Sequence, residues 1–590
     1  MRVMLLVLGL ILGAPGLAQD AADRVAPEGA GAGLFQVPAL LEASAKAKAA
    51  GRPVKAENWM IAAANPLAVE SGAKVLARGG TAADAMVAVQ AVLGLVEPQS
   101  SGLGGGAFLV WHDAESGEIT TLDARETAPL AVTPQLFLDA DGEPLDFFDA
   151  VVGGRSVGVP GTPALMAEAH ARWGRSPWPG LFTDAIRLAE DGFSVSPRLA
   201  MLVAGDVARL SRFAAIRAYF LPDGHPVQAG DTLRNPAYAE TLRKLAEDGA
   251  RGFYTGGVAE DIVARVQGVR DNLGRLSGTD LAIYRVKERA AVCSPYREFE
   301  VCGMGPPSSG GVTVAQILGL LEPFDLADLG PESAQAWRLI GDASRLAFAD
   351  RGRYLADSDF VPVPVAGLLA PDYLKSRSAL LRREDALPQV APGAPEFEHA
   401  LDWGEGRRGE RPSTSHVSIV DRDGNALSMT SSIENAFGSR LMVRGFLLNN
   451  QLTDFSFATH DGGRPIANAA APGKRPRSSM APTILRRDGR PVLVLGSPGG
   501  SRIIGYVAKT ILAWVDWGMD PQQAAGLPHL VNRFGPFELE PVADGLADEL
   551  RGLGYDVSIT DQTSGLHVIE IGQGLLGGAD PRREGLAYGD

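Results

Sequence analysis

The residues with the clearest chemical potential form a short polar stretch where strand-like sequence begins directly after loop-like sequence. Ser413, Thr414 and Ser415 precede the alternating run from His416 to Asp421. A threonine hydroxyl is a weak nucleophile unless a base lies beside it, and the α-amino group of an N-terminal residue, with a pKa of roughly 7.7–8, is such a base. A cut just before Thr414 would therefore place nucleophile and base on one residue. By itself, the same string is also typical of an ordinary strand start.

The sequence before this point is suited to a chain break. From Arg382 to Ser413, prolines, glycines and charged residues interleave with few residues of core type. That composition is typical of an exposed, flexible segment. Beyond it the pattern changes to strands, so the composition also favours a boundary at Thr414.

A hairpin prediction places other polar residues near Thr414. Asp423-Gly424 lies between two strand-like runs and predicts a two-residue type I′ turn. This register puts Thr414 opposite Ile433, and a β-bulge would shift it by one residue. Either register brings Thr414 close to Ser432 and Glu434.

A second candidate site is a glycine-rich turn between a buried strand and a helix. Val492–Leu495 is a continuous apolar run, Gly496-Ser497-Pro498-Gly499-Gly500 follows it, and a helix is expected from near Ser501 through Trp514. Backbone N–H groups at Gly499 and Gly500 could form an oxyanion hole. A plain strand-to-helix turn would have the same pattern.

Two other glycine-rich strings resemble functional motifs but favour a purely structural interpretation. Gly154–Gly158 fits the G-x-S-x-G pattern, but Val159-Pro160 follows where a nucleophile elbow needs a helix. Gly102–Ala107 loosely fits a dinucleotide fingerprint, yet it leads into a strand. We expect a loop and a tight turn, respectively.

Helix positions are signalled by capping residues. Asn65-Pro66 predicts an N-cap followed by proline at the first helical position. Thr81 and Asp84 predict a capping box for the next helix, which should stop before Pro98.

Composition limits the class of protein. The chain has 590 residues, 45% of them hydrophobic, and a net charge of −15. This charge argues against a nucleic-acid partner and against an anionic membrane surface. Met1–Ala18 has the charged end, apolar core and small-residue cleavage site of a secretory signal, too short to span a bilayer. We therefore expect a periplasmic or secreted protein.

The cysteines and histidines give no metal-site pattern. Cys293 and Cys302 flank a hairpin-like segment, so an exported chain could bridge them, although two unpaired core cysteines would read the same. Neither Cys-x-x-Cys nor His-Glu-x-x-His occurs, and the eight histidines are scattered. We expect no structural zinc.

Taken together, these strings resemble the gamma-glutamyltransferase (gamma-glutamyltranspeptidase) family of N-terminal nucleophile hydrolases. The similarity runs from about Ala62 to Arg583. Its most specific pieces are Ser101–Gly106, Asp123–Glu126, Thr414–His416, Leu448–Phe455, Lys474–Met480 and Gly496–Gly500.

The resemblance implies an α+β fold, a four-layer αββα sandwich, made as one precursor that cuts itself between Ser413 and Thr414. The mature protein would be a heterodimer of a large subunit (residues 19–413) and a small subunit (residues 414–590). Nothing in the sequence requires a metal or an organic cofactor, and we expect neither.

The resemblance also implies roles for individual residues. Thr414 would be the nucleophile, supported by Ser432, and N–H groups of Gly499 and Gly500 would stabilise the oxyanion. The γ-glutamyl group would be held by its carboxylate and its ammonium. Arg125 can bind a carboxylate through a bidentate fork. The other expected substrate contacts are Ser478 and Ser479 to the carboxylate, and Asp454, Glu434 and Gln451 to the ammonium.

Several residues depart from the family pattern. Ser432 stands where a threonine is common, Glu434 where many members have asparagine, and Arg477 where an apolar residue is usual. The segment Phe457–Gly473, at the position of the family's active-site lid, is short and has no tyrosine. These departures bear on substrate range.

Three functional hypotheses follow. The leading one is a γ-glutamyl hydrolase and transferase that acts on glutathione-like donors, with water or an amino-acid or peptide amine as acceptor. The second is an acylase of the same fold for glutaryl side chains, such as those of β-lactam precursors. The third is a catalytically silent binding protein, which would remain uncut.

Overall fold

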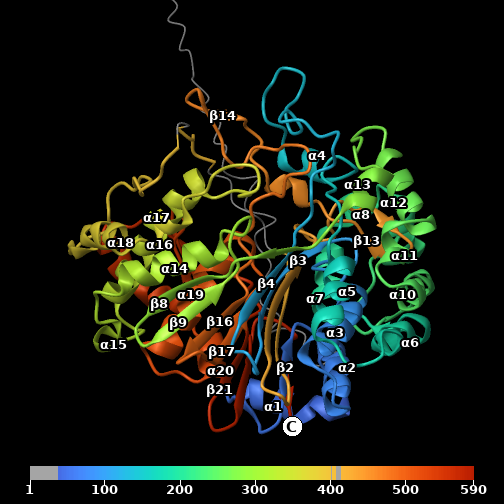
Figure 1. Ribbon diagram of the computed structural model, residues 1–590, viewed down its shortest axis with the longest axis horizontal. Helices are drawn as coiled ribbons and strands as arrows, with labels where there is room; N and C mark the ends of the chain where they lie inside the picture. Colours follow the sequence, from blue (N-terminus) through green and yellow to red (C-terminus); the bar gives the residue numbers. More distant parts are fainter. Residues whose placement is uncertain (1–36, 400–401, 407–412) are drawn as a thin grey trace, which may run out of the picture.

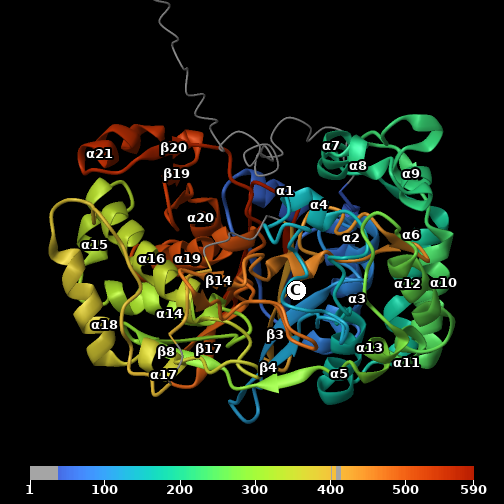
Figure 2. The same cartoon turned by 90° about the horizontal axis from the view of Figure 1, so that it is seen from above.

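Two seven-stranded antiparallel sheets stack at the centre of the molecule, and helices cover the outer face of each (Figure 1). The computed structural model describes residues 37–399, 402–406 and 413–590. The expected signal, residues 1–18, lies outside the described residues. From above, the two helical layers lie on opposite sides of the strands (Figure 2). The predicted four-layer αββα sandwich is confirmed.

One sheet contains the strand that begins after Thr414. Its strands, in spatial order, are β23 (Leu586–Gly589), β2 (Met60–Ala63), β10 (Ser415–Val420), β11 (Ala426–Ser432), β3 (Gly106–His112), β4 (Ile119–Ala124) and β7 (Lys287–Arg289). The other sheet has the order β1 (Val54–Ala56), β22 (Leu575–Ala579), β21 (His567–Ile571), β17 (Arg490–Gly496), β16 (Thr483–Arg487), β9 (Phe299–Gly303) and β8 (Val292–Tyr296).

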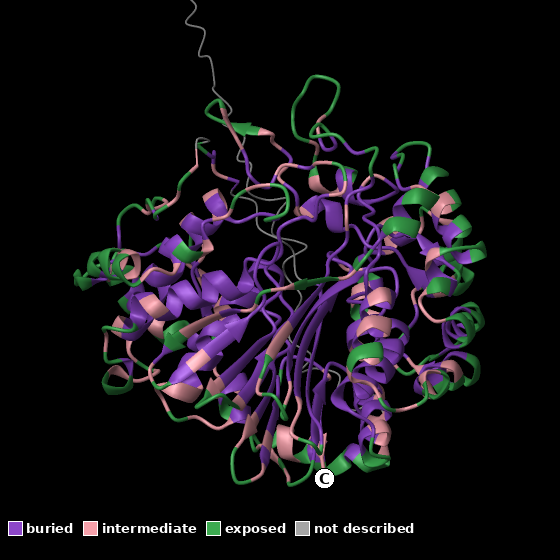
Figure 3. Cartoon of the chain, in the orientation of Figure 1, coloured by how far each residue is buried: buried purple, intermediate pink, exposed green. Residues whose placement is uncertain are grey.

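Alternation along β10 shows how the layers are built. Val417 and Ile419 point into the core that the first sheet shares with its helices, whereas Val420 joins the core between the sheets. Side chains of a strand alternate between its faces, so both faces of β10 are buried (Figure 3). Thr414 and His416 therefore belong to the side between the sheets, and Ser415 to the helical side.

The helices that cover the two sheets come from different parts of the chain. Those on the β10 sheet are α2 (Pro66–Ala77), α3 (Ala82–Val96) and α5 (Thr162–Trp173), while α6 (Thr183–Asp191) packs outside α3 and α10 (Pro236–Asp248) packs outside α6. Those on the β17 sheet include α14 (Gly310–Leu321) and α19 (Ile503–Val515), and α16 (Ala334–Tyr354) packs on α14.

The capping predictions are confirmed. The Asn65 side chain accepts a hydrogen bond from Leu67 N at the start of α2, with Pro66 as the first helical residue. At the start of α3, Thr81 and Asp84 form the predicted capping box, and the helix ends at Val96, before Pro98.

The glycine-rich strings have the predicted structures. Gly154–Gly158 is a loop, and Gly102–Ala107 turns into β3. After β17, Gly499 and Gly500 have φ angles of 140° and 58°, in the region that favours glycine. A Cβ on Gly499 would lie 2.5 Å from the Tyr506 ring. A short 3₁₀ turn, Gly500–Arg502, then leads into α19.

The predicted register of the β10–β11 hairpin is wrong by one residue. Val420 pairs with Ala426 and Ser415 with Ser431, so Thr414 lies opposite Ser432 rather than Ile433. Asp421 N donates to the Asn425 carbonyl at 3.0 Å, which leaves residues 422–424 in the turn, and Gly424 at its end has φ 89°. Asp421 determines this shape because its carboxylate accepts hydrogen bonds from Asp423 N and Asn425 N at 3.1 and 3.0 Å.

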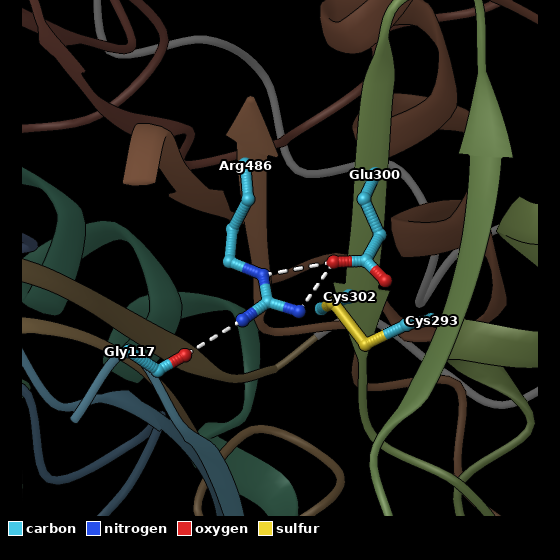
Figure 4. The surroundings of a disulfide bond; sticks show 5 residues. All are labelled: Gly117, Cys293, Glu300, Cys302 and Arg486. Carbon is cyan, nitrogen blue, oxygen red and sulfur yellow. Dashed lines mark hydrogen bonds and ion pairs between the residues drawn. A yellow bond between two sulfur atoms is a disulfide. The ribbon is translucent and has the colours of Figure 1, made fainter. Parts of the chain in front are cut away.

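The two cysteines form a cross-strand disulfide. Cys293 on β8 lies directly opposite Cys302 on β9. Glu300 and Arg486 make an ion pair beside it, and Arg486 also donates to the Gly117 carbonyl (Figure 4). This settles the alternative that the sequence left open.

Within the described ranges, no helix has both the length and the apolar character needed to cross a bilayer.

The Asp421 carboxylate gives the first testable prediction. Besides its turn contacts, it accepts a hydrogen bond from Ala82 N at the start of α3, where the helix dipole also favours a negative charge. We expect Asp421→Ala to lower the free energy of unfolding by about 2–4 kcal/mol, because the buried donor Ala82 N and two half-buried donors of the turn lose their acceptor. Urea denaturation measures this change.

Asp423→Ala is the matched control. Asp423 is exposed in the same turn and forms an ion pair with Arg175 at the surface. Its removal should cost less than about 1 kcal/mol. Equal losses in the two variants would show that the Asp421 contacts do not stabilise the hairpin.

Candidate active site

A small pocket opens at the edge where the ends of both sheets meet. It brings together eight of the residues that the sequence singled out. They are Arg125, Thr414, Ser432, Glu434, Gln451, Asp454, Ser478 and Gly500. Arg125 directly follows β4, Thr414 directly precedes β10 and Ser432 ends β11, while the others come from the loops and short turns beyond the strands. The stacked sheets thus bring residues far apart in the sequence to one point.

The Thr414 hydroxyl lies among acceptors and donors suited to peptide-bond chemistry. Thr414 Oγ1 donates to the Ser413 carbonyl oxygen at 2.5 Å and contacts Ser432 Oγ at 3.2 Å. Ser432 Oγ also donates to the Ser413 carbonyl at 2.8 Å and accepts from Glu434 N at 2.9 Å. The carbonyl before Thr414 is therefore polarised by two hydroxyl groups, and all these side chains are buried.

Arg125 forms the positive wall of the pocket. It follows β4, is 1% exposed, and donates from Nε to the Pro476 carbonyl at 3.1 Å and from Nη2 to the Arg477 carbonyl at 3.0 Å. Its Nη2 also forms an ion pair with Asp454. Gln451 Nε2 donates to the same Asp454 oxygen at 2.7 Å. These contacts hold the guanidinium and the carboxylate in fixed orientations.

Glu126, which lies next to Arg125, leaves the positive charge of this wall uncancelled. Its Oε2 lies 3.9 Å from Arg125 Nη1, and burial raises the pKa of Glu126 to about 8. A carboxyl that is neutral at pH 7 does not cancel the charge of Arg125. Asp454 therefore provides the negative charge that balances Arg125 within the pocket.

Glu434 contributes a second carboxylate in an unusual backbone conformation. It follows β11 and has φ 74°, a left-handed value that is uncommon outside glycine. Asn450 Nδ2 donates to its Oε2. Such conformations persist where the surroundings hold them, often at functional sites.

Three predicted residues are not brought to the pocket. Gly499 shapes the turn, but Gly500 alone of the two glycines lines the pocket. Ser479 Oγ accepts from Arg351 Nη2 at 2.7 Å, behind the pocket wall. Ser413 is buried beside the pocket, and its hydroxyl donates to the Gln99 carbonyl at 2.5 Å.

Ser478 lines the pocket, although its hydroxyl already has a partner. Ser478 Oγ accepts from Met480 N at 3.1 Å, while its carbonyl accepts from Ser309. A hydroxyl that accepts from the backbone keeps its own proton available for donation.

His416 is not a base of this site. Its ring nitrogens contact Thr430 Oγ1 at 2.8 Å and Ser418 Oγ at 3.0 Å, between the sheets. His567 stacks near it, with ring centroids 6.2 Å apart. Burial, followed by the neighbouring His567, keeps the pKa of His416 well below its usual value. Both rings are therefore neutral parts of the core.

Sequence reasoning missed several residues near the nucleophile. Met480 and Ile503 line the pocket, Arg583 Nη1 donates to the Thr414 carbonyl at 2.9 Å, and Glu97 accepts from Ser415. Met480 is the last residue of a motif that the sequence did single out, Lys474–Met480, although no role was assigned to it. Glu97 and Arg583 have no local pattern that separates them from ordinary ion-pair residues.

Two departures from the family pattern have structural explanations. Arg477 is buried, and its guanidinium donates to the carbonyls of Arg351 and Gly406 at 3.0 and 3.1 Å, so it supports the wall of the pocket. The segment 457–473 forms the small hairpin of β14 (His460–Asp461) and β15 (Arg464–Pro465). No residue of this segment lines the pocket.

One group of potential metal ligands occurs in the described part of the chain. It consists of Cys293, Glu300 and Cys302. The two thiols form the disulfide and therefore do not provide thiolates for an ion.

The protein is a four-layer αββα sandwich, and a hydroxyl residue at the start of a central strand faces a polar pocket between the sheets. This combination defines the class of N-terminal nucleophile hydrolases. The family model described as Gamma-glutamyltranspeptidase matches residues 68–589. The chain belongs to the gamma-glutamyltranspeptidase family.

Curated relatives agree with this assignment over most of the chain. The chain is 37% identical to "Glutathione hydrolase proenzyme" of Bacillus subtilis (strain 168), covering 90% of this chain and 92% of the relative. It is 36% identical to the Escherichia coli (strain K12) protein of the same name, covering 90% and 91%. It is also 34% identical to "Acylase ACY 1 proenzyme" of Pseudomonas sp. (strain SE83), covering 87% and 90%.

Solved structures share the fold. Cephalosporin acylase from Bacillus halodurans superposes with a TM-score of 0.81 at 26% identity, covering 91% of this chain and 97% of that chain. Gamma-glutamyltranspeptidase from Helicobacter pylori gives 0.55 at 37% identity, covering 57% and 96%.

The buried histidine pair generates a prediction of pH dependence. Burial, followed by the charge of Lys48, lowers the pKa of His567 from 6.5 to about 3. The unfolded chain therefore binds a proton that the folded chain excludes between these values, so stability falls as the pH falls below 6.5. Each pH unit in this window costs about 1.4 kcal/mol from this group.

We expect His567→Asn to reduce the loss of stability between pH 6.5 and 5 by about 2 kcal/mol relative to the parent. Urea denaturation at both pH values measures the difference, so any fixed cost of the substitution cancels. A variant with the same pH dependence as the parent would contradict this assignment.

Proposed function

We propose that this protein is a self-processing γ-glutamyl hydrolase and transferase that acts on glutathione-like donors. Family membership supports the enzyme class, and the relatives named glutathione hydrolase proenzyme support the donor. The observation that carries the proposal is the placement of Thr414 Oγ1 within hydrogen-bond distance of the Ser413 carbonyl, beside Arg125 and two carboxylates.

Self-cleavage would begin at the Ser413–Thr414 peptide bond. Thr414 Oγ1 attacks the Ser413 carbonyl carbon, the C–N bond breaks, and the hydroxyl proton goes to the leaving nitrogen. The resulting ester is opened by water, which gives a Ser413 carboxylate, restores the Thr414 hydroxyl and leaves a free α-amine. Residues 19–413 and 414–590 would then be the large and small subunits of a heterodimer.

The pocket suits a γ-glutamyl group because it holds both signs of charge. The α-carboxylate of the donor would bind Arg125 and the Ser478 hydroxyl, and its α-ammonium would bind Asp454 and Glu434, with Gln451 orienting Asp454. Ser479 would act indirectly, through Arg351. Its hydroxyl accepts a hydrogen bond from Arg351, and this contact accounts for the position of Ser479 behind the pocket wall. A zwitterionic donor would replace the ion pair between Arg125 and Asp454 with two new ion pairs. Its carboxylate would pair with Arg125, and its ammonium with Asp454.

Turnover would reuse the same nucleophile. The α-amine of Thr414 takes the hydroxyl proton as Oγ1 attacks the γ-amide carbonyl, and Ser432 supports the hydroxyl. N–H groups at Gly499 and Gly500 would stabilise the oxyanion. The amine then protonates the departing nitrogen. Water, or the amine of an amino acid or peptide, receives the acyl group.

An acylase for glutaryl side chains is the second candidate, favoured by the acylase relative and by the 0.81 superposition. A glutaryl group lacks the α-ammonium. Two carboxylates in the pocket, Asp454 and Glu434, therefore favour the γ-glutamyl donor.

The same proposal places the enzyme in the periplasm or outside the cell. The charged, apolar and small-residue pattern of Met1–Ala18 supports export. The Cys293–Cys302 disulfide is compatible with an oxidising compartment.

The nucleophile assignment can be tested by the mass of the purified protein under denaturing conditions. The parent should give two fragments, the smaller beginning at Thr414, whereas Thr414→Ala should remain one chain without activity on a γ-glutamyl anilide. Thr414→Ser keeps a hydroxyl and should still be cut. Normal cleavage of Thr414→Ala would refute the assignment.

The ammonium contact can be tested with Glu434→Gln, which keeps the size and the Asn450 contact but removes the charge. We expect KM for γ-glutamyl-p-nitroanilide to rise roughly tenfold, the equivalent of about 1.4 kcal/mol for one charge-assisted contact. Glutaryl-p-nitroanilide, which has no ammonium, serves as the matched substrate and should show no such loss. Equal losses on both would remove Glu434 from ammonium recognition.

A further inference from the structure

Charged side chains lie behind Thr414 on the side of the sheet away from the pocket. Glu97 caps the C-terminal end of α3, Arg198 begins α7 (Pro197–Gly205), and Arg583 and Glu584 precede β23. Glu97, Arg198 and Arg583 are at most 2% exposed. Two acidic and two basic residues, from three distant parts of the chain, thus meet behind the nucleophile.

Two of these residues contact the chain at Thr414 and Ser415, Glu97 through the Ser415 side chain and Arg583 through the Thr414 carbonyl. Glu97 Oε2 accepts from Ser415 Oγ at 2.8 Å, and Ser101 Oγ donates to the same Ser415 oxygen at 3.1 Å. Arg583 Nη1 donates to the Thr414 carbonyl at 2.9 Å. Hydrogen bonds to charged groups are stronger than neutral ones, so the contacts of Glu97 and Arg583 restrain this peptide firmly.

Charge interactions couple the two residues. Burial raises the pKa of Glu97, while the charges of Arg583 and Arg198 and the Ser415 hydrogen bond oppose that rise. Arg198 Nε lies 3.8 Å from Glu97 Oε1. The positive charge of Arg583, which donates to Thr414, therefore favours the ionised form of Glu97, which accepts from Ser415.

The sheet itself leaves a gap at this point. β11 pairs with β10 from Ser415 onward, but β2 pairs with β10 only from Val417 to Val420. The start of β10 thus has a strand neighbour on one side only. A chain end with few backbone partners frays readily, and cleavage before Thr414 would create such an end where the nucleophile must be held still.

We propose that Glu97 and Arg583 are positioning residues that take the place of the missing strand neighbour and hold the new N-terminus of Thr414 after cleavage. This inference rests on the proposed function of Thr414. Neither residue lines the pocket, so they act on the nucleophile and not on donor binding. Glu97 acts on Thr414 through its hydrogen bond with Ser415, and Arg583 acts through its hydrogen bond to the Thr414 carbonyl.

The test compares full-length chains carrying Glu97→Gln, Arg583→Met, Arg583→Lys and Glu584→Gln. Glu584 is the matched control, because it belongs to the same cluster but contacts Asn65 and the Arg198 backbone instead of residues 414–415. Fragment masses give the extent of cleavage, and γ-glutamyl-p-nitroanilide gives kcat and KM of the processed protein. Thermal unfolding reports folding separately.

We expect Glu97→Gln and Arg583→Met to lower kcat about 10–100-fold with KM changed less than about twofold, because a displaced nucleophile slows chemistry without weakening binding. Arg583→Lys should recover much of the loss, and Glu584→Gln should retain the parent kcat. If Arg583→Met does not fold, Glu97→Gln and Arg583→Lys still carry the comparison.

Parent-like kcat in processed Glu97→Gln would overturn the inference, as would an equal fall in kcat for Glu584→Gln, which would indicate a purely structural cluster. These results leave the proposed function intact as long as the parent is cut before Thr414. A parent that stays uncut would instead refute the proposed function, and this inference with it.

Discussion

The pairing of β10 within its sheet is the constraint on which the site depends. β10 lies between β2 and β11, both antiparallel to it, and its side chains alternate between two buried faces. Alternation leaves Thr414 on the side between the sheets, facing the pocket, and Ser415 on the helical side. A shift of one residue would exchange the two hydroxyl groups. The chemistry of the site therefore depends on a register that the Asp421 turn and both apolar cores maintain together.

Stacked sheets explain how the pocket is assembled. Arg125 follows β4, Glu434 follows β11, and Gly500 follows β17 of the opposite sheet. Loops at strand ends are free to carry polar groups, while most of the strands behind them are buried (Figure 3). Burial also means that each charged group in the pocket needs a partner of opposite charge, because an unpaired charge away from water is costly. The Arg125–Asp454 pair meets that need in the uncut chain, and a zwitterionic donor would meet it in turnover.

The uncut chain and the proposed mature enzyme use the same groups for two reactions. Thr414 and Ser432 contact the Ser413 carbonyl, and in the proposed mechanism a donor carbonyl would later take its place. Cleavage would convert an amide nitrogen into the amine that serves as base, so the first reaction prepares the second. The departures from the family pattern fall mainly on the wall. Glu434 adds charge to the pocket, while Arg477 supports the wall from behind by its contacts to main-chain carbonyls.

Local sequence determined the features whose physics is local. The caps at Asn65 and Thr81, the buried strand before Gly496, and the strand start at Thr414 follow from turn chemistry, capping and hydrophobic period, and the family resemblance supplied the αββα fold and the pocket residues. Tertiary structure alone decided the rest. The Asp421 carboxylate, shared between the turn and α3, moved the hairpin register by one residue. Ser479 accepts a hydrogen bond from Arg351. Glu97 and Arg583, which are far apart in the sequence, both lie behind Thr414. Such contacts join residues hundreds of positions apart, and they depend on packing that no local pattern records.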